Sequence, residues 1–282
     1  MKEILFSILT GFLGRVIGRN NLVRYGNFLA RAGRLDCPNK LTDNGEAMVQ
    51  TIVLNHSKSK NIKIIDCGAN KGEWTNQLCR LFKLSKNVEK LDVYCFEPSF
   101  FTFKKLVSNS EKIISSNINI YPVNKALSNK DGKALLSISH PGAGTNSLIQ
   151  IPESHHETEP IIMVKLSTFL KEHSINNLSL LKIDAEGADP EIIEGAMELI
   201  SNQNIGVIQF EYNWRWIYGG YFLHGIFEAL NANNYHIGKI TSKGVQFFPK
   251  YDVELETFVE ANYIACTHEW YTKFPKAEYW KS

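Results

Sequence analysis

The sequence has few cysteines, and their arrangement suggests neither a covalent framework nor a metal site. They are odd in number and show no C-x-x-C spacing: Cys37, Cys67, Cys79, Cys95 and Cys266. A fold held by disulfides and a structural zinc site are therefore not expected. This cysteine usage fits a reducing compartment, and we predict a cytoplasmic protein.

A strong net charge is also missing. The 31 basic and 29 acidic side chains leave a net charge of +2, and no basic tract is interleaved with aromatic residues. Proteins that follow a phosphate backbone carry such a tract. Nucleic acid is therefore not an expected partner.

No apolar run is long enough to span a bilayer. The N-terminal apolar stretch Ile4–Ile17 is too short, and no small-x-small cleavage site follows it. We predict that residues 1–60 form a helical extension that packs on the protein body or on a second subunit. Because Arg15, Arg19 and Arg24 accompany the stretch, peripheral contact with anionic lipid is the alternative.

What the sequence does contain is an apolar run that ends in an acid and enters a glycine-rich turn, Asp66-Cys67-Gly68-Ala69-Asn70-Lys71-Gly72. The helix expected after the turn offers unpaired N–H groups to a carboxylate. A dinucleotide fingerprint G-x-G-x-x-G would use the same scaffold, but Asn70 stands at its second glycine. Asp66 disfavours a pyrophosphate and attracts an ammonium or a sulfonium. S-adenosylmethionine carries both cations, whereas an ordinary strand-to-helix turn would bind nothing.

A second acid follows the next expected strand. The apolar stretch of residues 91–96 leads into Glu97, and Pro98 prevents the strand from continuing. An acid at this strand end can accept hydrogen bonds from both hydroxyls of a ribose. A third strand over residues 118–124 leads to Ala126, which we expect to border an adenine ring.

Two further strands end in acids. Residues 178–183 precede Asp184 and Glu186, and residues 205–210 precede Glu211. The carboxyl ends of parallel strands share one edge of a sheet. We therefore expect the acids that end the four strands to line one crevice: Asp66, Glu97, Asp184 and Glu211.

The sequence segments around these strand ends resemble those of FkbM-type S-adenosylmethionine-dependent methyltransferases, and the resemblance covers residues 61–213. It implies a class I methyltransferase fold and methylation of a hydroxyl on a sugar, polysaccharide or natural product. It also implies roles for individual residues. Asp184 and Glu186 would border the transfer site, and the cofactor would be bound by Asp66, Gly68, Asn70, Gly72 and Glu97, with Pro98 and Ala126 beside them.

The expected architecture is an α/β, Rossmann-like, doubly wound sheet of about seven strands in a domain of residues 61–282. Late strands near residues 235–240 and 262–267 would form an antiparallel hairpin. An insertion over residues 129–177 would overhang the crevice. Within it we expect two short strands, and a helix over Thr168–His173 that is capped by Ser167.

Methylation of a hydroxyl needs a base or a metal that acidifies the oxygen. Asp184 is the preferred base. With Glu211 and Asn213 it also offers hard oxygen ligands for Mg²⁺. Imidazole titrates near neutral pH, so the other candidate bases are histidines: His140, His155, His156 and His224.

The densest aromatic cluster spans residues 212–222, directly after the fifth strand. Aromatic faces can stack on sugars, so we expect Trp214 and Tyr218 to form an acceptor wall opposite His140. Ordinary packing against the sheet is the alternative.

The predicted function is S-adenosylmethionine-dependent O-methyl transfer. Two alternatives are a non-catalytic scaffold that binds the cofactor and a nicotinamide-dependent oxidoreductase. Asp66 and the absence of a third glycine disfavour the oxidoreductase.

Overall fold

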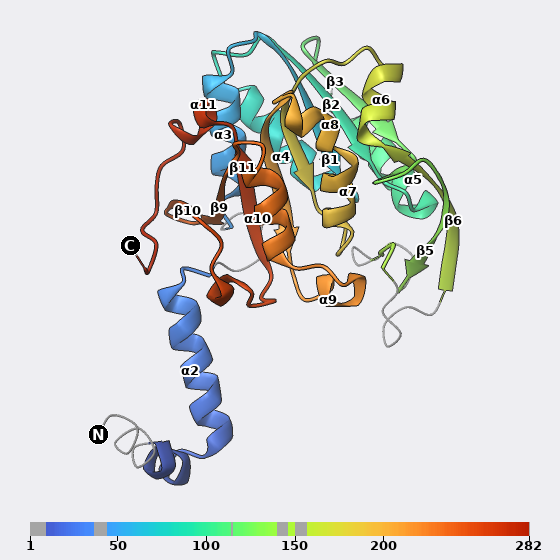
Figure 1. Ribbon diagram of the computed structural model, residues 1–282. Coiled ribbons are helices and arrows are strands. Elements are labelled where there is room, and N and C mark those ends of the chain that lie inside the picture. The colour runs from blue at the N-terminus through green and yellow to red at the C-terminus, as the bar shows by residue number, and fades with distance from the viewer. Residues whose placement is uncertain (1–9, 37–43, 114, 140–145, 150–156, 282) are drawn as a thin grey trace.

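The computed structural model describes residues 10–36, 44–113, 115–139, 146–149 and 157–281 (Figure 1). Its centre is an eight-stranded sheet with the order β10-β9-β11-β8-β7-β1-β2-β3. The strands are β1 (Asn61–Cys67), β2 (Lys90–Phe96), β3 (Ile118–Val123), β7 (Leu178–Ile183), β8 (Ile205–Tyr212), β9 (His236–Thr241), β10 (Gly244–Phe248) and β11 (Ala261–Cys266).

Five strands of this sheet, β3-β2-β1-β7-β8, are parallel, and β11 is antiparallel to β8 and β9. The strand order reverses at β1, as it does in doubly wound sheets. The predicted α/β doubly wound fold is therefore confirmed. The carboxyl ends of β1, β2, β7 and β8 meet at one edge, which we call the rim.

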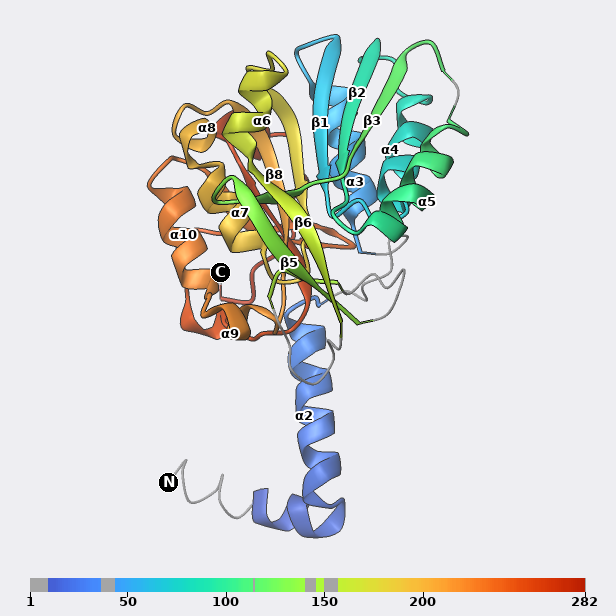
Figure 2. The same cartoon turned by 90° about the vertical axis from the view of Figure 1, so that its right-hand side faces the viewer.

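Helices cover both faces of the sheet because its parallel strands are apolar on both sides (Figure 2). Ile64, Leu180 and Val207 pack into one core, and Ile65, Leu181 and Ile208 pack into the other. The first core is covered by α3 (Glu46–His56), α4 (Glu73–Phe82), α5 (Phe100–Ser110) and α11 (His268–Tyr271). The second is covered by α6 (Leu166–Glu172), α7 (Asp189–Gly195), α8 (Met197–Ser201) and α10 (Leu223–Asn231).

The sheet has one strand more than the predicted seven. The late strands β9 and β11 are antiparallel neighbours as expected, but the hairpin partner of β9 is β10. This strand is only five residues long and its central Gln246 is polar, so it lacks the apolar run on which the other strands were recognised. The short helix α9 (Trp216–Gly219) and the 3₁₀ turn η1 (Val253–Leu255) complete this half.

The insertion forms a second sheet with the order β4-β6-β5, from β4 (Ala126–Ser128), β5 (Gly132–Ile138) and β6 (Glu157–Lys165). The two strands expected in it are β5 and β6. The predicted cap of the following helix is wrong, because α6 begins at Leu166 and Ser167 lies inside it. The carboxylate of Asp131 serves this helix start instead, accepting from Lys165 N at 2.7 Å and from Thr168 Oγ1 at 2.9 Å.

The N-terminal part of the described chain projects away from the body as helix α2 (Arg19–Gly33) (Figures 1 and 2). In contrast, α3 packs on the sheet, although it falls within the extension predicted for residues 1–60. Among the described residues, no helix combines the length and the apolar character needed to cross a membrane.

Candidate active site

The turn after β1 is fixed by the two neighbouring strands. The amides of Gly68 and Ala69 both donate to Phe96 O at the end of β2, at 3.1 and 2.9 Å. Gly68 has a φ of 75°, and a Cβ on it would lie 1.8 Å from the carbonyl oxygen of Asp184. A side chain here would collide with the backbone that follows β7, and the positive φ independently favours glycine. The position therefore requires glycine.

The rest of the turn reaches the start of α4. Gly72, with a φ of 84°, is the N-cap residue of α4. Asn70 also has a positive φ, of 49°, and its amide donates to Glu97 Oε2 at 3.0 Å. The side-chain oxygen Oδ1 of Asn70 is buried and has no hydrogen-bond partner among the described residues.

Glu97, at the end of β2, is held by two backbone amides. Asn70 N donates to Oε2 and Ser99 N donates to Oε1, each at 3.0 Å. Burial raises the pKa of Glu97 to about 7, although these two N–H groups act in the opposite direction. Each carboxylate oxygen keeps a second lone pair, so a hydroxyl donor can still bind there.

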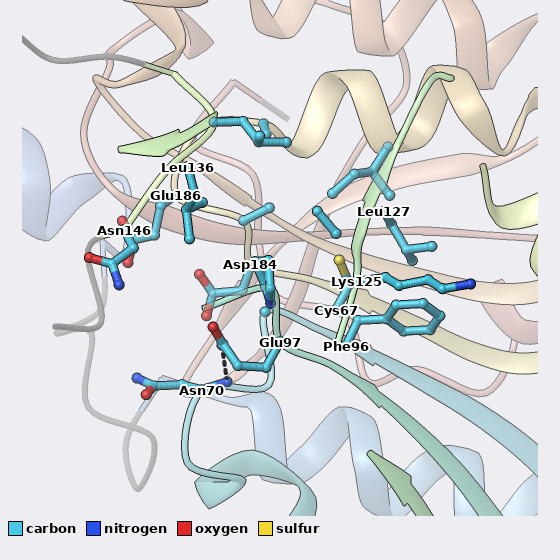
Figure 3. A pocket seen from close by; sticks show the side chains of 17 residues that line it. Cys67, Asn70, Phe96, Glu97, Lys125, Leu127, Leu136, Asn146, Asp184 and Glu186 are labelled. Atoms are coloured by element: carbon cyan, nitrogen blue, oxygen red, sulfur yellow. Dashed lines mark hydrogen bonds between the residues drawn. The ribbon is translucent and has the colours of Figure 1, made fainter. Parts of the chain in front are cut away.

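A cavity of about 570 Å³, including its opening to solvent, lies beside Glu97 (Figure 3). Five of the residues predicted to bind cofactor line it: Gly68, Asn70, Glu97, Pro98 and Ala126. The insertion contributes Leu136, Asn146 and Leu148 to the same lining, and β7 contributes Asp184 and Glu186 through the turn that follows it.

Two residues of the predicted cofactor set, Asp66 and Gly72, are not among the described residues that line this cavity. The Asp66 side chain is fully buried. It accepts from Thr75 Oγ1 at 2.7 Å and pairs with Lys182 Nζ at 3.3 Å. The structure thus places Asp66 beneath the turn, in contact with Thr75 and Lys182, which are also not among the described residues that line this cavity.

Lys182 is the central cation of the site. Its ammonium lies 3.3 Å from Asp66 Oδ1, 3.2 Å from Asp184 Oδ2 and 3.4 Å from the Gly68 carbonyl oxygen. Burial alone would lower its pKa, but Asp184, Asp66 and Glu46 together raise that pKa well above the usual value. Lys182 is therefore protonated and joins the ends of β1 and β7.

The strand register extends this pair into a polar row across the sheet. Lys182 is the register partner of Asp66 on one side and of Gln209 on the other. Gln209 Nε2 donates in turn to Glu46 Oε1, at the first turn of α3. Burial raises the pKa of Glu46, and the ammonium of Lys182 lowers it in part.

A second, more polar cavity adjoins the first on the α3 side, with about 610 Å³ of space including its opening. It shares Gly68, Asn70 and Asp184 with the first cavity. Its other lining residues come from the start of α3, from α4 and from β7 and β11: Asn44, Glu46, Ala69, Glu73, Trp74, Lys182 and Asn262. Asp184 and the turn after β1 thus lie between the two cavities and line both of them.

The other two predicted catalytic acids are Glu186 and Glu211. Glu186 pairs with Arg215 at 3.1 Å, and burial together with the charge of Asp184 raises the pKa of Glu186 to about 8. Glu211 is buried, and Asp189 Oδ1 accepts from its backbone amide at 3.1 Å. Burial and the neighbouring acids raise the pKa of Glu211 well above its usual value.

The residues proposed as magnesium ligands are already engaged with each other. Asn213 Nδ2 donates to Glu211 Oε2 at 2.5 Å, and Asn213 Oδ1 accepts from Arg215 N at 2.9 Å. Within the described ranges, no group of three or more His, Cys, Asp or Glu side chains could hold a metal ion. A magnesium site at Asp184, Glu211 and Asn213 therefore stays a prediction.

The aromatic cluster divides into a buried and an exposed part. Tyr212 and Trp216 are fully buried in the core, whereas Trp214 is 39% exposed and Tyr218 is 48% exposed. The rings of Trp214 and Tyr218 meet edge to face at 6.0 Å. Arg215 connects them to the site, because its guanidinium lies 5.0 Å from the Trp214 ring and also pairs with Glu186.

The candidate histidine bases are not brought to the cavity by any described contact. His140, His155 and His156 lie outside the described residues. His224 is on α10, where it lies 3.7 Å from Glu228. The four described cysteines are buried and free, and Cys37 is also outside the described residues.

Sequence reasoning missed Lys182, Glu46 and Gln209. One signal was available: Lys182 interrupts an apolar strand two positions before Asp184, so both side chains point to the same face. A lysine inside a buried strand requires an acidic partner. Nothing local in the sequence indicates that Glu46 would cover this row.

Comparison with known proteins adds a family relationship. The model described as the methyltransferase FkbM domain matches residues 66–237, which is more than half of the chain. No curated protein matches the chain. The family match and the order of the parallel strands identify the fold as the class I methyltransferase fold.

Several solved structures are similar in fold. Methyltransferase FkbM from Methylobacillus flagellatus KT matches with 14% identity and a TM-score of 0.43, over 76% of this chain and 47% of that one. The chain thus spans about half the length of that relative. Precorrin-6y C5,15-methyltransferase from Geobacter metallireducens GS-15 matches with 12% identity and a TM-score of 0.39, over 78% and 87%. Aeropyrum pernix fibrillarin, in complex with natively bound S-adenosyl-L-methionine, matches with 9% identity and a TM-score of 0.36, over 78% and 76%.

The first prediction concerns the buried ammonium. Lys182→Met keeps the length of the side chain but leaves Asp66 buried without its cation. We expect the free energy of unfolding to fall by about 3–5 kcal/mol, as it does when one partner of a buried ion pair is removed. Chemical denaturation measures this loss.

The surface pair Lys58–Glu269 provides the matched control, since its atoms lie 2.7 Å apart and its side chains are 80% and 45% exposed. Lys58→Met should cost about 1 kcal/mol or less. Adding Asp66→Asn to Lys182→Met should recover part of the lost stability. Equal losses for the two lysine variants would show that the buried ammonium is not a structural requirement.

Proposed function

The chain belongs to the FkbM methyltransferase family, and we propose that it transfers the methyl group of S-adenosylmethionine to a hydroxyl of a sugar, polysaccharide or natural product. The observation that carries this proposal is Glu97, whose two oxygens are each fixed by a backbone N–H at the edge of the first cavity. A carboxylate held in this way is preorganised for the two hydroxyls of a ribose.

The other lining residues fit the remaining parts of this cofactor. Ala126, Leu127 and Phe96 offer apolar contacts to a purine. The buried Oδ1 of Asn70 has no partner among the described residues and suits an ammonium donor. The carboxylate of Asp184 adds negative charge near the place where a sulfonium would lie.

The bound cofactor would supply an electrophilic methyl group, and the protein must align the acceptor with it and remove a proton. Alignment of reacting groups contributes up to about 7–11 kcal/mol. The Asp184 side chain is 38% exposed, lines both cavities and is oriented by Lys182 at 3.2 Å. We assign it the role of the base that accepts the hydroxyl proton. Glu186 lies in the same turn and Glu211 at the end of the next strand, which makes them auxiliary acids of this site.

The aromatic pair is the proposed contact for the acceptor. Trp214 and Tyr218 are half exposed and follow β8 at the rim. The contact of Arg215 with both Trp214 and Glu186 supports this assignment, because Glu186 lines the first cavity. His140, the other proposed acceptor contact, lies outside the described residues.

The second prediction is a pH-dependent affinity for the cofactor. Hydrogen bonds from ribose hydroxyls favour the ionised form of Glu97, so its pKa should be lower in the complex than the value of about 7 without ligand. Affinity for S-adenosylmethionine should therefore be constant above about pH 7. Below it, affinity should fall by up to about tenfold per pH unit. Calorimetry across this range measures the effect.

Glu97→Ala should weaken binding at least tenfold at pH 8, since each hydrogen bond to a charged group contributes about 1.5–3 kcal/mol. It should also remove the pH dependence. Glu111→Ala, which changes an exposed acid at the end of α5, is the matched control. Unchanged affinity in a folded Glu97→Ala protein, or tighter binding of NADH than of S-adenosylmethionine, would contradict the assignment.

The third prediction concerns proton removal. Asp184→Asn keeps the size of the side chain but removes the base. Cofactor binding should survive, weakened only by the loss of one negative charge near the sulfonium, whereas the single-turnover rate at saturating cofactor with a hydroxyl acceptor should fall by about 10²-fold or more. A single-turnover rate near that of the unmodified protein would show that another residue is the base.

Chelation separates the two roles considered for Asp184. Loss of activity in EDTA with recovery in Mg²⁺ would support coordination by Asp184, Glu211 and Asn213. Activity that is unaffected by EDTA leaves Asp184 as a base alone. Failure to detect any methylated product with an acceptor that binds would favour a non-catalytic scaffold.

The fourth prediction concerns the acceptor. Trp214→Ala or Tyr218→Ala should weaken acceptor binding by about 1–3 kcal/mol, because each ring would lose the contact area it buries against a sugar. KM for the acceptor should rise while the affinity for S-adenosylmethionine stays unchanged. The control is Tyr121→Ala, which removes a 40% exposed ring from the edge strand β3. Equal acceptor kinetics in all three variants would place the acceptor elsewhere.

A further inference from the structure

The N-terminal segment of residues 10–36, which we call the arm, has no part in the core. Helix α2 contains no buried residue. Its large apolar side chains lie in solvent, with exposed fractions of 62% for Val23, 62% for Tyr25, 68% for Phe28 and 67% for Leu29. Monomeric proteins rarely expose such a contiguous apolar surface unless it binds something.

Before its root at Asp36, which pairs with Arg34 at 3.5 Å, the arm carries charge of a single sign. Residues 10–35 contain Arg15, Arg19, Arg24, Arg31 and Arg34 and no aspartate or glutamate. One stripe of α2 is apolar and another carries arginines, while Val23 lies beside Arg19 and Phe28 borders Arg24 at the i, i+4 spacing. Arg24 and Arg31 are seven residues apart and share one face, whereas Leu22, Tyr25 and Leu29 follow the i, i+3, i+7 spacing of another.

The root of the arm is anchored to the body. Lys239 in β9 donates from Nζ to the Arg34 carbonyl oxygen at 2.6 Å and to Asp36 Oδ1 at 2.7 Å. Both the Lys239 and the Asp36 side chains are buried. The direction in which the arm leaves the body is therefore fixed at this point.

The arm leaves on the side of the rim. Helix α9, which directly follows the carboxyl end of β8, lies on the lower side of the body in both views, and α2 extends from that same side (Figures 1 and 2). The candidate active site opens at this rim. Whatever the arm binds therefore lies on the side from which an acceptor reaches Asp184.

We propose that the arm binds the surface of an anionic lipid bilayer and holds the rim toward it. An amphipathic helix with arginines on one face and Leu, Tyr and Phe on the other lies in the plane of a membrane interface, with its apolar face among the headgroups. The arginines meet the anionic headgroups, and the exposed side chains of α2 leave water. This binding needs no methyl transfer, so it can be tested apart from the proposed reaction.

Charge is the reason for choosing lipid over a second copy of the chain. Pairing two arms would bring together two segments that carry five arginines each and no acid within residues 10–35. A nucleic acid would neutralise the arginines but would leave the apolar face of α2 without a partner. An anionic bilayer is complementary to both faces.

Vesicle sedimentation with the full chain is the test. The protein should bind vesicles of phosphatidylcholine mixed with phosphatidylglycerol and should bind pure phosphatidylcholine far less. Replacing both Arg24 and Arg31 by Gln should weaken binding roughly 10- to 30-fold, the scale of two basic residues at an anionic surface. Replacing both Phe28 and Leu29 by Gln should weaken it by a similar factor.

The matched control lies at the opposite end of the sheet, in the turn between α4 and β2. Changing the exposed residues Lys83, Leu84 and Lys86 to Gln removes two charges and one apolar group there and should leave vesicle binding unchanged. The arm variants should keep the thermal stability and the S-adenosylmethionine affinity of the unmodified chain, since they alter no buried side chain.

Three results would overturn the proposal. The first is equal binding to charged and neutral vesicles, and the second is undiminished binding by both arm variants. The third is occupation of the arm by another partner. RNA binding that competes with vesicles and depends on Arg24 and Arg31 but not on Phe28 would assign the arm to nucleic acid. A dimer lost in the Phe28 and Leu29 variant without lipid would assign it to a second copy.

Discussion

The ammonium of Lys182 joins the two strand ends on which the candidate site is built. It neutralises the buried carboxylate of Asp66 and orients the partly exposed carboxylate of Asp184, at 3.3 and 3.2 Å. Removing a charge from water is costly, so each of these groups is stable there only because the others are present. Asp184 is therefore held in place from inside the sheet, although its side chain reaches the cavities.

In this arrangement Asp66, the acid that begins the glycine-rich motif, has a structural role. Asp66 is an internal ligand for Lys182 and Thr75, and the turn above it presents backbone groups and Asn70 to the cavity. Gly68 has a structural role as well, because the carbonyl oxygen of Asp184 occupies the space that a side chain would need. The motif thus fixes the distance between β1 and β7 as much as it shapes a ligand site.

The sequence predicted the parts of the molecule that depend on local pattern. Apolar runs that end in acids located β1, β2, β7 and β8, and the parallel order then placed Glu97 and Asp184 at one rim. Contacts between distant segments were not predictable in this way. The approach of Glu46 to Gln209 spans 163 residues, and Asp131 caps α6 from a separate loop. Strand β10 was missed because pairing with β9, rather than an apolar run, defines it.

The root of the arm and the residue before α3 both lie against strand β9, since Asp36 pairs with Lys239 and Gly45 packs against Ile240 and Thr241. The anchored root of the arm ends at Asp36, and Glu46 follows ten positions later, beside Gln209 and the polar cavity. A bilayer that holds the arm would therefore face the rim, where Asp184 lines both cavities. The first cavity, lined by Glu97 and Ala126, shares Asp184, Gly68 and Asn70 with the polar cavity. The proposed acceptor surface, Trp214 and Tyr218, is linked to this first cavity by Arg215, which pairs with Glu186, so cofactor and acceptor would meet beside Asp184.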